Sequence, residues 1–163
     1  MIAKYREGAG GALLDEYERA IADLQDVIEN ITDEELLKVV DAKTVDINCR
    51  SVQTILSHVV SCGYAYAVDI RKLTEGEIDY PEKVFHSAVK NYQKDLDSFF
   101  VFMVNTFKNI HDNQLEQPDN SKKIMTSWGQ IYDIEQITEH AIVHILRHRR
   151  QIEKFKMLLR GEI

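Results

Sequence analysis

Apolar residues that recur every three or four positions constrain the fold of this chain more than any other feature. Between residues 11 and 30 the pattern includes Leu14, Tyr17, Ile21 and Leu24. This spacing places apolar side chains along one narrow stripe of an α-helix. The chain has only two prolines and seven glycines, so few residues would interrupt such helices. The pattern therefore predicts long amphipathic helices that pack through their apolar stripes.

Three further segments carry the same pattern. They cover residues 51–73, 82–110 and 133–159, and Ser51 and Asp133 are suited to cap the first and the last of them. Four long helices joined by short or medium connections are typical of a four-helix bundle.

A short helix is predicted between the first two long ones. The sequence "TDEE" places Thr32 as an N-cap and Glu35 where it completes a capping box, and this helix is expected to end near Val40. Residues 1–10 are predicted to form a loose N-terminal arm. No repeat or linker divides the chain, so residues 1–163 are predicted to be one domain. The expected fold is all-α, a four-helix bundle with a short extra helix after the first.

Residues 99–104, "FFVFMV", are apolar on every side of the third predicted long helix. A helix that is apolar all round is usually buried on more than one face. Two explanations fit this stretch: deep packing within the chain, or a contact between two copies of it. The second would make the protein a homodimer.

The overall charge limits the partners of the chain. Its formal net charge of −7 at pH 7 argues against binding to nucleic acid or to an anionic membrane. No apolar run is long enough to span a bilayer, and the first residues, "MIAKYREGAGG", contain no apolar signal segment. The expected location is therefore the cytoplasm. There Cys49 and Cys62 are predicted to be free thiols, with Cys62 on a buried helix face.

The last predicted helix carries three of the six histidines at intervals of four residues: His140, His144 and His148. At about 100° per residue, His148 lies about 40° from the centre of the apolar stripe, His144 about 80° and His140 about 120°. His148 is therefore predicted to face the core, His144 to lie at its edge and His140 to flank it.

A histidine pair with this spacing can bind one metal ion, because both side chains project over the same surface patch. A third ligand would come from another helix. His58 is the best candidate, since it lies about 60° from Ile55 on the second long helix. Three neutral imidazoles would leave a coordination position open for water or a substrate. The alternative is that these are ordinary core or surface histidines. His86 and His111 lack any partner pattern and are predicted to be surface residues.

Two other features each have two interpretations. The sequence "RHRRQ", residues 147–151, is either a basic patch or a solvated helix end, and the acidic net charge favours the second. Trp128 either covers a pocket or packs its loop against the core. The chain contains no glycine-rich phosphate loop and no evident Ser/His/Asp arrangement for nucleophilic catalysis.

Two motifs resemble those of the DinB/YfiT-like superfamily. The first is "SVQTILSHVV" at 51–60, with one histidine early in the second long helix. The second lies in "DIEQITEHAIVHILRHRRQIEKF" at 133–155, where HxxxH is followed by Arg, any residue and Gln. The residues that match are His58, His144, His148, Arg149 and Gln151.

This resemblance covers essentially the whole chain. It implies a bundle in which His58, His144 and His148 hold a divalent metal ion, usually zinc or nickel, and many members are homodimers. Characterised relatives include metal-dependent thiol transferases, among them bacillithiol transferases and mycothiol-dependent maleylpyruvate isomerases. The chain shows no second domain like that of the mycothiol enzymes, so their specific reaction is not expected.

Three functional hypotheses follow. The first is a transferase that joins a low-molecular-weight thiol to a small-molecule electrophile, with the metal lowering the pKa of the thiol. The second is a hydrolase that uses metal-bound water, and the third is a non-catalytic metal-binding protein of a stress response. The candidates for pocket-lining residues are Tyr66, Trp128, His140 and Gln151. Of these, His140 is predicted to act as an acid or base at the open position without binding the metal.

Overall fold

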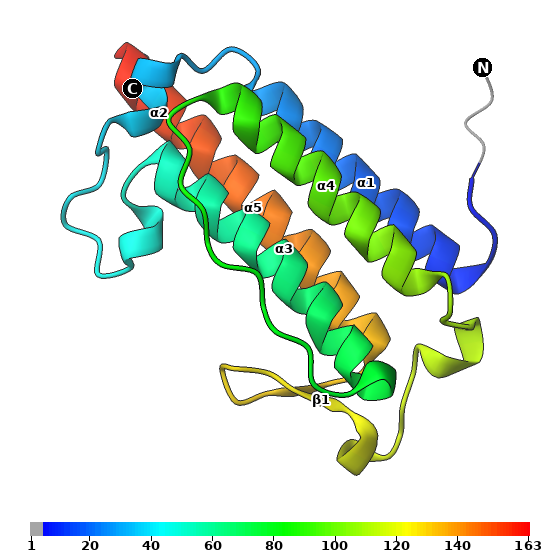
Figure 1. The fold of residues 1–163 in the computed structure, drawn as a ribbon. Helices are drawn as coiled ribbons and strands as arrows, with labels where there is room; N and C mark the ends of the chain where they lie inside the picture. The colour runs from blue at the N-terminus through cyan, green and yellow to red at the C-terminus, as the bar shows by residue number, and fades with distance from the viewer. Residues whose placement is uncertain (1–4) are drawn as a thin grey trace.

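The computed structural model describes residues 5–163, and the regular structure in this part of the chain is almost entirely helical (Figure 1). The short helix α2 (Asp33–Leu37) follows the first long helix. The all-α class, the four-helix bundle and the short extra helix are therefore confirmed. The long helices are α1 (Gly8–Ile28), α3 (Val52–Glu75), α4 (Val89–Phe107) and α5 (Ile134–Arg160). The remaining elements are the 3-10 turns η1 (Ile47–Cys49), η2 (Asp112–Gln114) and η3 (Asn120–Lys122) and the antiparallel strands β1 (Ile124–Met125) and β2 (Ile131–Tyr132).

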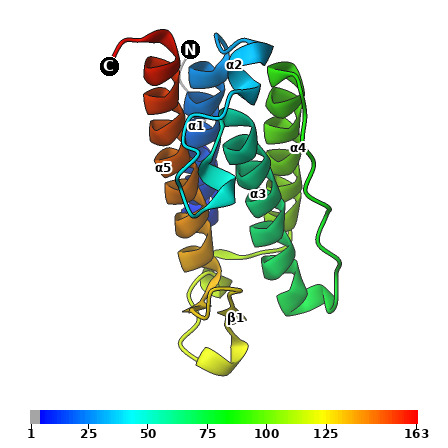
Figure 2. The same cartoon turned by 90° about the vertical axis from the view of Figure 1, so that its left-hand side faces the viewer.

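The four long helices pack in a ring in which α1 and α3 each contact both α4 and α5 (Figures 1 and 2). Helices α1 and α5 run in one direction, and α3 and α4 run in the other. Because α3 and α4 are consecutive and parallel, the chain between them has to return along the bundle. Residues 76–88 make this return as an extended segment beside α3 (Figure 1).

The prediction for the third long helix is wrong at its start, because α4 begins at Val89, seven residues later than expected. Helix α3 has 24 residues, and an α-helix of that length is about 36 Å long. Residues 76–88 can cover this distance only when extended, since a residue adds about 3.3 Å in an extended chain and about 1.5 Å in a helix. The segment is held by two hydrogen bonds of 3.0 Å, from Gln53 Nε2 to the carbonyl of His86 and from the N–H of His86 to the hydroxyl of Tyr92.

The predicted N-terminal arm is shorter than expected. Helix α1 begins at Gly8, and the guanidinium of Arg6 donates to Asp15 at 2.6 Å and to Glu18 at 2.7 Å. The described part of the arm is therefore attached to α1, while residues 1–4 lie outside the described residues.

The capping box predicted for α2 is present. Thr32 Oγ1 accepts a hydrogen bond from the N–H of Glu35, whose carboxylate accepts one from the N–H of Thr32. Helix α2 ends at Leu37, earlier than predicted, and Val39 then forms an antiparallel bridge with Ser51. This bridge brings the chain to the start of α3.

An aromatic cluster fills the space between α1, α3 and α4. The ring of Tyr17 lies 6.2 Å from that of Phe99, and neither side chain has any exposed surface. Gly63 of α3 allows Phe99 to approach closely, since a Cβ at Gly63 would lie 2.6 Å from its ring. A larger residue at this position would push the two helices apart.

The apolar stretch at residues 99–104 is explained mainly by packing within the chain. Phe99, Phe100 and Met103 are buried, whereas Val101 is 57% exposed. The homodimer therefore stays a prediction. No α-helix in residues 5–163 combines the length and the hydropathy that a membrane crossing requires.

Candidate metal centre

Helices α3 and α5 bring the three predicted ligands together. Ser51 and Asp133 cap these helices through capping boxes, which fixes where each helix starts. Because α3 and α5 run antiparallel, the early turns of α3 lie opposite the middle of α5 (Figure 1). His58 consequently faces His144 and His148, which are one turn apart on α5.

The facing ring nitrogens of these histidines are close to one another. His144 Nε2 lies 3.0 Å from His58 Nε2 and 3.2 Å from His148 Nε2, and one nitrogen from each of the three lies within 4.8 Å of the others. Two nitrogens bound to one tetrahedral zinc ion at about 2.0–2.1 Å are about 3.3–3.4 Å apart. The spacing and the donor type therefore fit a divalent metal ion held by three imidazoles.

The environment keeps these three imidazoles neutral, which is the form that binds a metal. Burial, together with the charges of neighbouring groups, lowers the pKa of His58 to about 4 and that of His144 to about 2. Burial also lowers the pKa of His148, which has no exposed surface, although its hydrogen bond to Gln151 acts in the opposite direction. Neutral histidine ligands therefore do not have to lose a proton before they bind a cation near pH 7.

Gln151 fixes the orientation of His148. Its Oε1 accepts a hydrogen bond from His148 Nδ1 at 3.1 Å, which leaves the Nε2 lone pair facing the other two histidines. The same Oε1 lies 3.6 Å from Cys49 Sγ, which also donates to Asp46 at 3.4 Å. The η1 turn thus supports the metal centre through Gln151, and the sequence pattern gave no sign of this role for Cys49.

Cys62 also contacts the group of histidines. Its Sγ lies 3.6 Å from His58 Nδ1, and the side chain is partly buried against the apolar core, so the buried position predicted for it is confirmed in part. The signal that could have revealed this contact is spacing, because Cys62 follows His58 by four residues on the same helix.

The family of the chain follows from a comparison with family models. The model described as "DinB family" matches residues 4–158. The chain belongs to the DinB family. No curated protein matches it. The suspected resemblance is thus confirmed over almost the entire chain, and the DinB family is metal-binding.

In this DinB-family chain His140 stands beside the three histidines without joining them. Its ring is nearly parallel to that of His144, with a centroid separation of 6.3 Å and an interplanar angle of 17°. Burial, assisted by the charge of Arg147, lowers the pKa of His140. The helical-wheel order of His148, His144 and His140 from core to edge therefore matches the structure.

Trp128 covers His140 instead of packing into the core. The two rings stack at 4.9 Å with an angle of 20°, and Trp128 is 44% exposed. Tyr66 of α3 lies edge-on to both, with its ring centre 5.6 Å from that of His140. Of the four residues predicted to line the pocket, these three lie together, and Gln151 lies on the other side of His148.

The remaining predicted residues lie elsewhere. His111 is exposed as expected. His86 has an acidic partner that the sequence did not indicate, since its Nε2 lies 2.6 Å from Asp95 Oδ2. Arg149 binds Asp23 of α1 at 3.1 Å, so this motif residue joins two helices of the DinB bundle.

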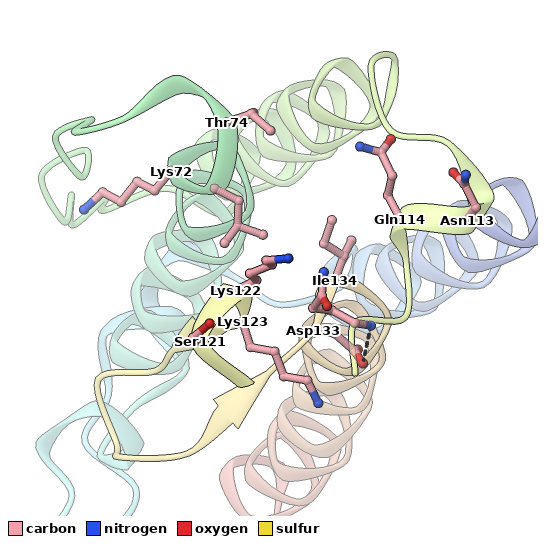
Figure 3. A pocket seen from close by; sticks show the side chains of 11 residues that line it. Lys72, Thr74, Asn113, Gln114, Ser121, Lys122, Lys123, Asp133 and Ile134 are labelled. Carbon is pink, nitrogen blue, oxygen red and sulfur yellow. Dashed lines mark hydrogen bonds between the residues drawn. The ribbon is translucent and has the colours of Figure 1, made fainter. Parts of the chain in front are cut away.

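A separate cavity of about 550 Å³ opens at the end of the bundle where α5 begins (Figure 3). Its lining includes Lys122, Gln114 and Ile134. Ile134 is ten residues before His144, or about 15 Å along the helix axis. None of the histidines lines this cavity, so it is distinct from the candidate metal centre.

Proposed function

We propose that this DinB-family protein is a metal-dependent transferase that binds one zinc or nickel ion and joins a low-molecular-weight thiol to a small electrophile. The observation that carries the proposal is the convergence of His58, His144 and His148, with no fourth protein ligand in the group among residues 5–163. Such a site has a coordination position left for another molecule. When bound, a divalent ion supplies a Lewis acid that lowers the pKa of a thiol or of water beside it.

The surrounding residues support the steps that the metal does not perform. Gln151 holds His148 in one tautomer, which keeps its Nε2 available as a ligand. His140 lies one turn from His144, and its lowered pKa keeps it neutral near pH 7, so it can accept a proton from the thiol. Trp128 and Tyr66 shield this proton transfer from bulk water.

The direct test supplies metal-loaded protein with cysteine and with 1-chloro-2,4-dinitrobenzene. In this reaction the sulfur–carbon bond forms, the carbon–chlorine bond breaks, chloride leaves with the electron pair and the thiol proton passes to His140 or to solvent. Metal-dependent turnover above the background rate supports the proposal. Hydrolysis of esters or amides without any thiol would instead indicate a hydrolase, and inactivity in both assays would indicate a non-catalytic metal-binding protein.

The role of His140 has its own test. His140→Ala should leave the metal content intact and slow thiol transfer by roughly 10- to 1,000-fold, the range of single acid–base losses. His111→Ala, at an exposed histidine, is the matched control and should change neither property. Loss of the metal from His140→Ala would show that His140 is a ligand, and an unchanged rate would show that it has no part in the reaction.

The cellular context belongs to the same proposal. A thiol that is free and reduced is abundant only in a reducing compartment, which fits a cytoplasmic location.

We also propose a homodimer, supported by the exposed Val101 within the apolar stretch of α4.

A further inference from the structure

The outer side of the candidate metal centre is bordered by an aromatic wall, formed by Tyr66, Trp128, Tyr132 and His140. Trp128 is its centre, with ring separations of 4.9 Å to His140, 6.1 Å to Tyr132 and 6.3 Å to Tyr66. Tyr66 also lies 5.9 Å from His144, so the wall reaches the edge of the three-histidine group. A flat apolar group could therefore rest on this wall while another part of the same molecule lies beside the histidines.

Two further apolar residues are exposed in the hairpin whose turn carries Trp128. Met125 of β1 and Ile131 of β2 are 65% and 40% exposed, and both flank the turn that carries Trp128. Exposed apolar residues that gather in one place mark binding surfaces more often than singly exposed ones. Access to the metal centre from this side thus favours a ligand with an apolar part.

The charges around the metal centre are mainly positive. Arg147 is exposed and lies three residues after His144, and within residues 5–163 no acidic side chain pairs with it, whereas the nearby Arg149 binds Asp23. Besides burial, which is the main cause, the charge of Arg147 lowers the pKa of His144 and of His140. Because residues three apart on a helix are neighbours, Arg147 lies one turn from His144 on the same side of α5, with a guanidinium free to bind an anion.

One further cation and one acid complete this balance. The Lys83 ammonium donates to Asn48 at 2.5 Å, and its charge contributes to the lowered pKa of His58. The acid is Asp46, whose charge acts in the opposite direction on the pKa of His58 and of His148. The single negative charge of Asp46 is outnumbered by two basic side chains and a divalent ion. Such a site attracts anions and disfavours cations.

The spacing along α5 sets the size of a matching ligand. His140 precedes His144 by four residues and Arg147 follows it by three. His140 and Arg147 are therefore about 10 Å apart along the helix axis, with His144 between them. A small aromatic or similarly flat acid has these dimensions.

We infer that the electrophile taken by this centre is a small organic anion whose flat apolar part rests on the aromatic wall while Arg147 binds its negative group. This inference rests on the proposed function, because it names a substrate class for the same metal centre. It assigns Trp128 and Arg147 as the residues that determine specificity.

Calorimetric titration of the zinc-loaded protein with three probes tests the inference. Benzoate has both features, benzamide lacks the charge and acetate lacks the ring. We expect benzoate to bind with a Kd of about 1 mM, within the affinity that a ligand of this size can reach. Benzamide and acetate should each bind at least about 10-fold more weakly, the effect of losing a charge-assisted hydrogen bond or a ring contact. Benzoate should also change the fluorescence of Trp128, the only tryptophan of the chain.

Variants identify which residue causes each preference. Arg147→Ala should remove the preference for benzoate over benzamide, while Lys154→Ala should keep it; Lys154 is exposed on the same face of α5, two turns farther along. Trp128→Ala should remove the preference for benzoate over acetate, and Trp128→Phe, which keeps a ring, should retain most of it.

Equal affinity for benzoate and benzamide would overturn the inference, and so would equal effects of Arg147→Ala and Lys154→Ala. A benzoate Kd above about 30 mM would do the same, because the site would then bind it no better than weak non-specific association. These titrations require no turnover, so they separate this inference from the proposed function. Thiol transfer without probe preference contradicts only the inference, and probe preference without thiol transfer contradicts only the transferase.

Discussion

The interior of the bundle differs between its two sides. Around α1 and α4 it is mainly apolar, and Tyr17 and Phe99 have no exposed surface; the Tyr17 hydroxyl is buried there without a hydrogen-bond partner among residues 5–163. Between α3 and α5 it contains His58, His144 and His148, of which His148 is also completely buried. On the first side, burial of apolar surface stabilises the fold. On the second side, buried polar rings lower the stability of the fold unless they bind a metal ion or form hydrogen bonds.

The difference teaches which interactions each side depends on. Packing of apolar rings requires no partner molecule, and the α1–α4 side should be equally stable with or without metal. The histidine rings lose their hydration when buried, and their lowered pKa values show that this burial disfavours the charged form. The α3–α5 side should therefore gain stability when a cation binds.

The largest expected effect is the loss of metal from His148→Ala. The unmodified protein should bind about one divalent ion per chain, and the variant should bind none tightly, because two imidazoles remain. Elemental analysis after dialysis measures the content, and His86→Ala, at a histidine paired with Asp95, is the control. Full metal content in His148→Ala would refute the ligand assignment.

The opposite side is tested by Phe99→Ala. Removing this buried ring should lower the free energy of unfolding by about 3–5 kcal/mol, as measured by urea denaturation. The loss should be similar in metal-free and metal-loaded protein. Lys94→Ala, five residues earlier in α4 and exposed, should change it by less than about 0.5 kcal/mol. If added metal restored Phe99→Ala to full stability, the two sides would not be separate.

A smaller effect is expected for Gln151. Gln151→Ala removes the acceptor of the His148 Nδ1–H bond and should weaken metal binding by about 10- to 100-fold, as loss of such a supporting contact typically does. Competition with a chelator measures the affinity. Gln151→Glu keeps an acceptor oxygen and should stay close to the original affinity; equal losses in both variants would mean that the hydrogen bond is not the cause.

The last prediction concerns the pH dependence of stability in metal-free protein. The pKa of His58 is about 4 in the fold, mainly because of burial, and about 6.5 when unfolded. The unfolded state therefore binds more protons below pH 6.5, and stability should fall as pH decreases from about 6.5 to 4. The slope is at most about 1.4 kcal/mol per pH unit for one histidine. Denaturation curves of His58→Ala should show a smaller slope, and an identical slope would contradict this account.

The sequence was most informative where a single helix determines the geometry. The order of His148, His144 and His140 follows from the angle per residue, and the structure reproduces it. His58 could be proposed because it lies beside an apolar stripe, and the family motif agreed. Contacts made by loops could not be obtained this way, since no periodicity describes the path of a loop. For that reason the sequence left open whether Trp128 covers a pocket or packs its loop against the core.

The return segment at residues 76–88 shows a second limit. Val84 and Ala88 within this segment continue the apolar pattern of α4, so the sequence predicted a helix from residue 82. The extended conformation is set by the distance between the end of α3 and the start of α4, which no local pattern contains. The link between Cys49 and Gln151 was missed for the same reason, because its residues are far apart in the chain.

The contact between α1 and α5 has a consequence for how the protein is made. These are the first and the last helices of the bundle, and they pack side by side. During synthesis α1 therefore has no partner on that side until α5 has left the ribosome. His144 and His148, which belong to α5, can approach His58 only at the same stage. Pairing of such distant segments slows folding. Acquisition of a metal ion by the nascent protein would accordingly mark the completion of folding and would not initiate it.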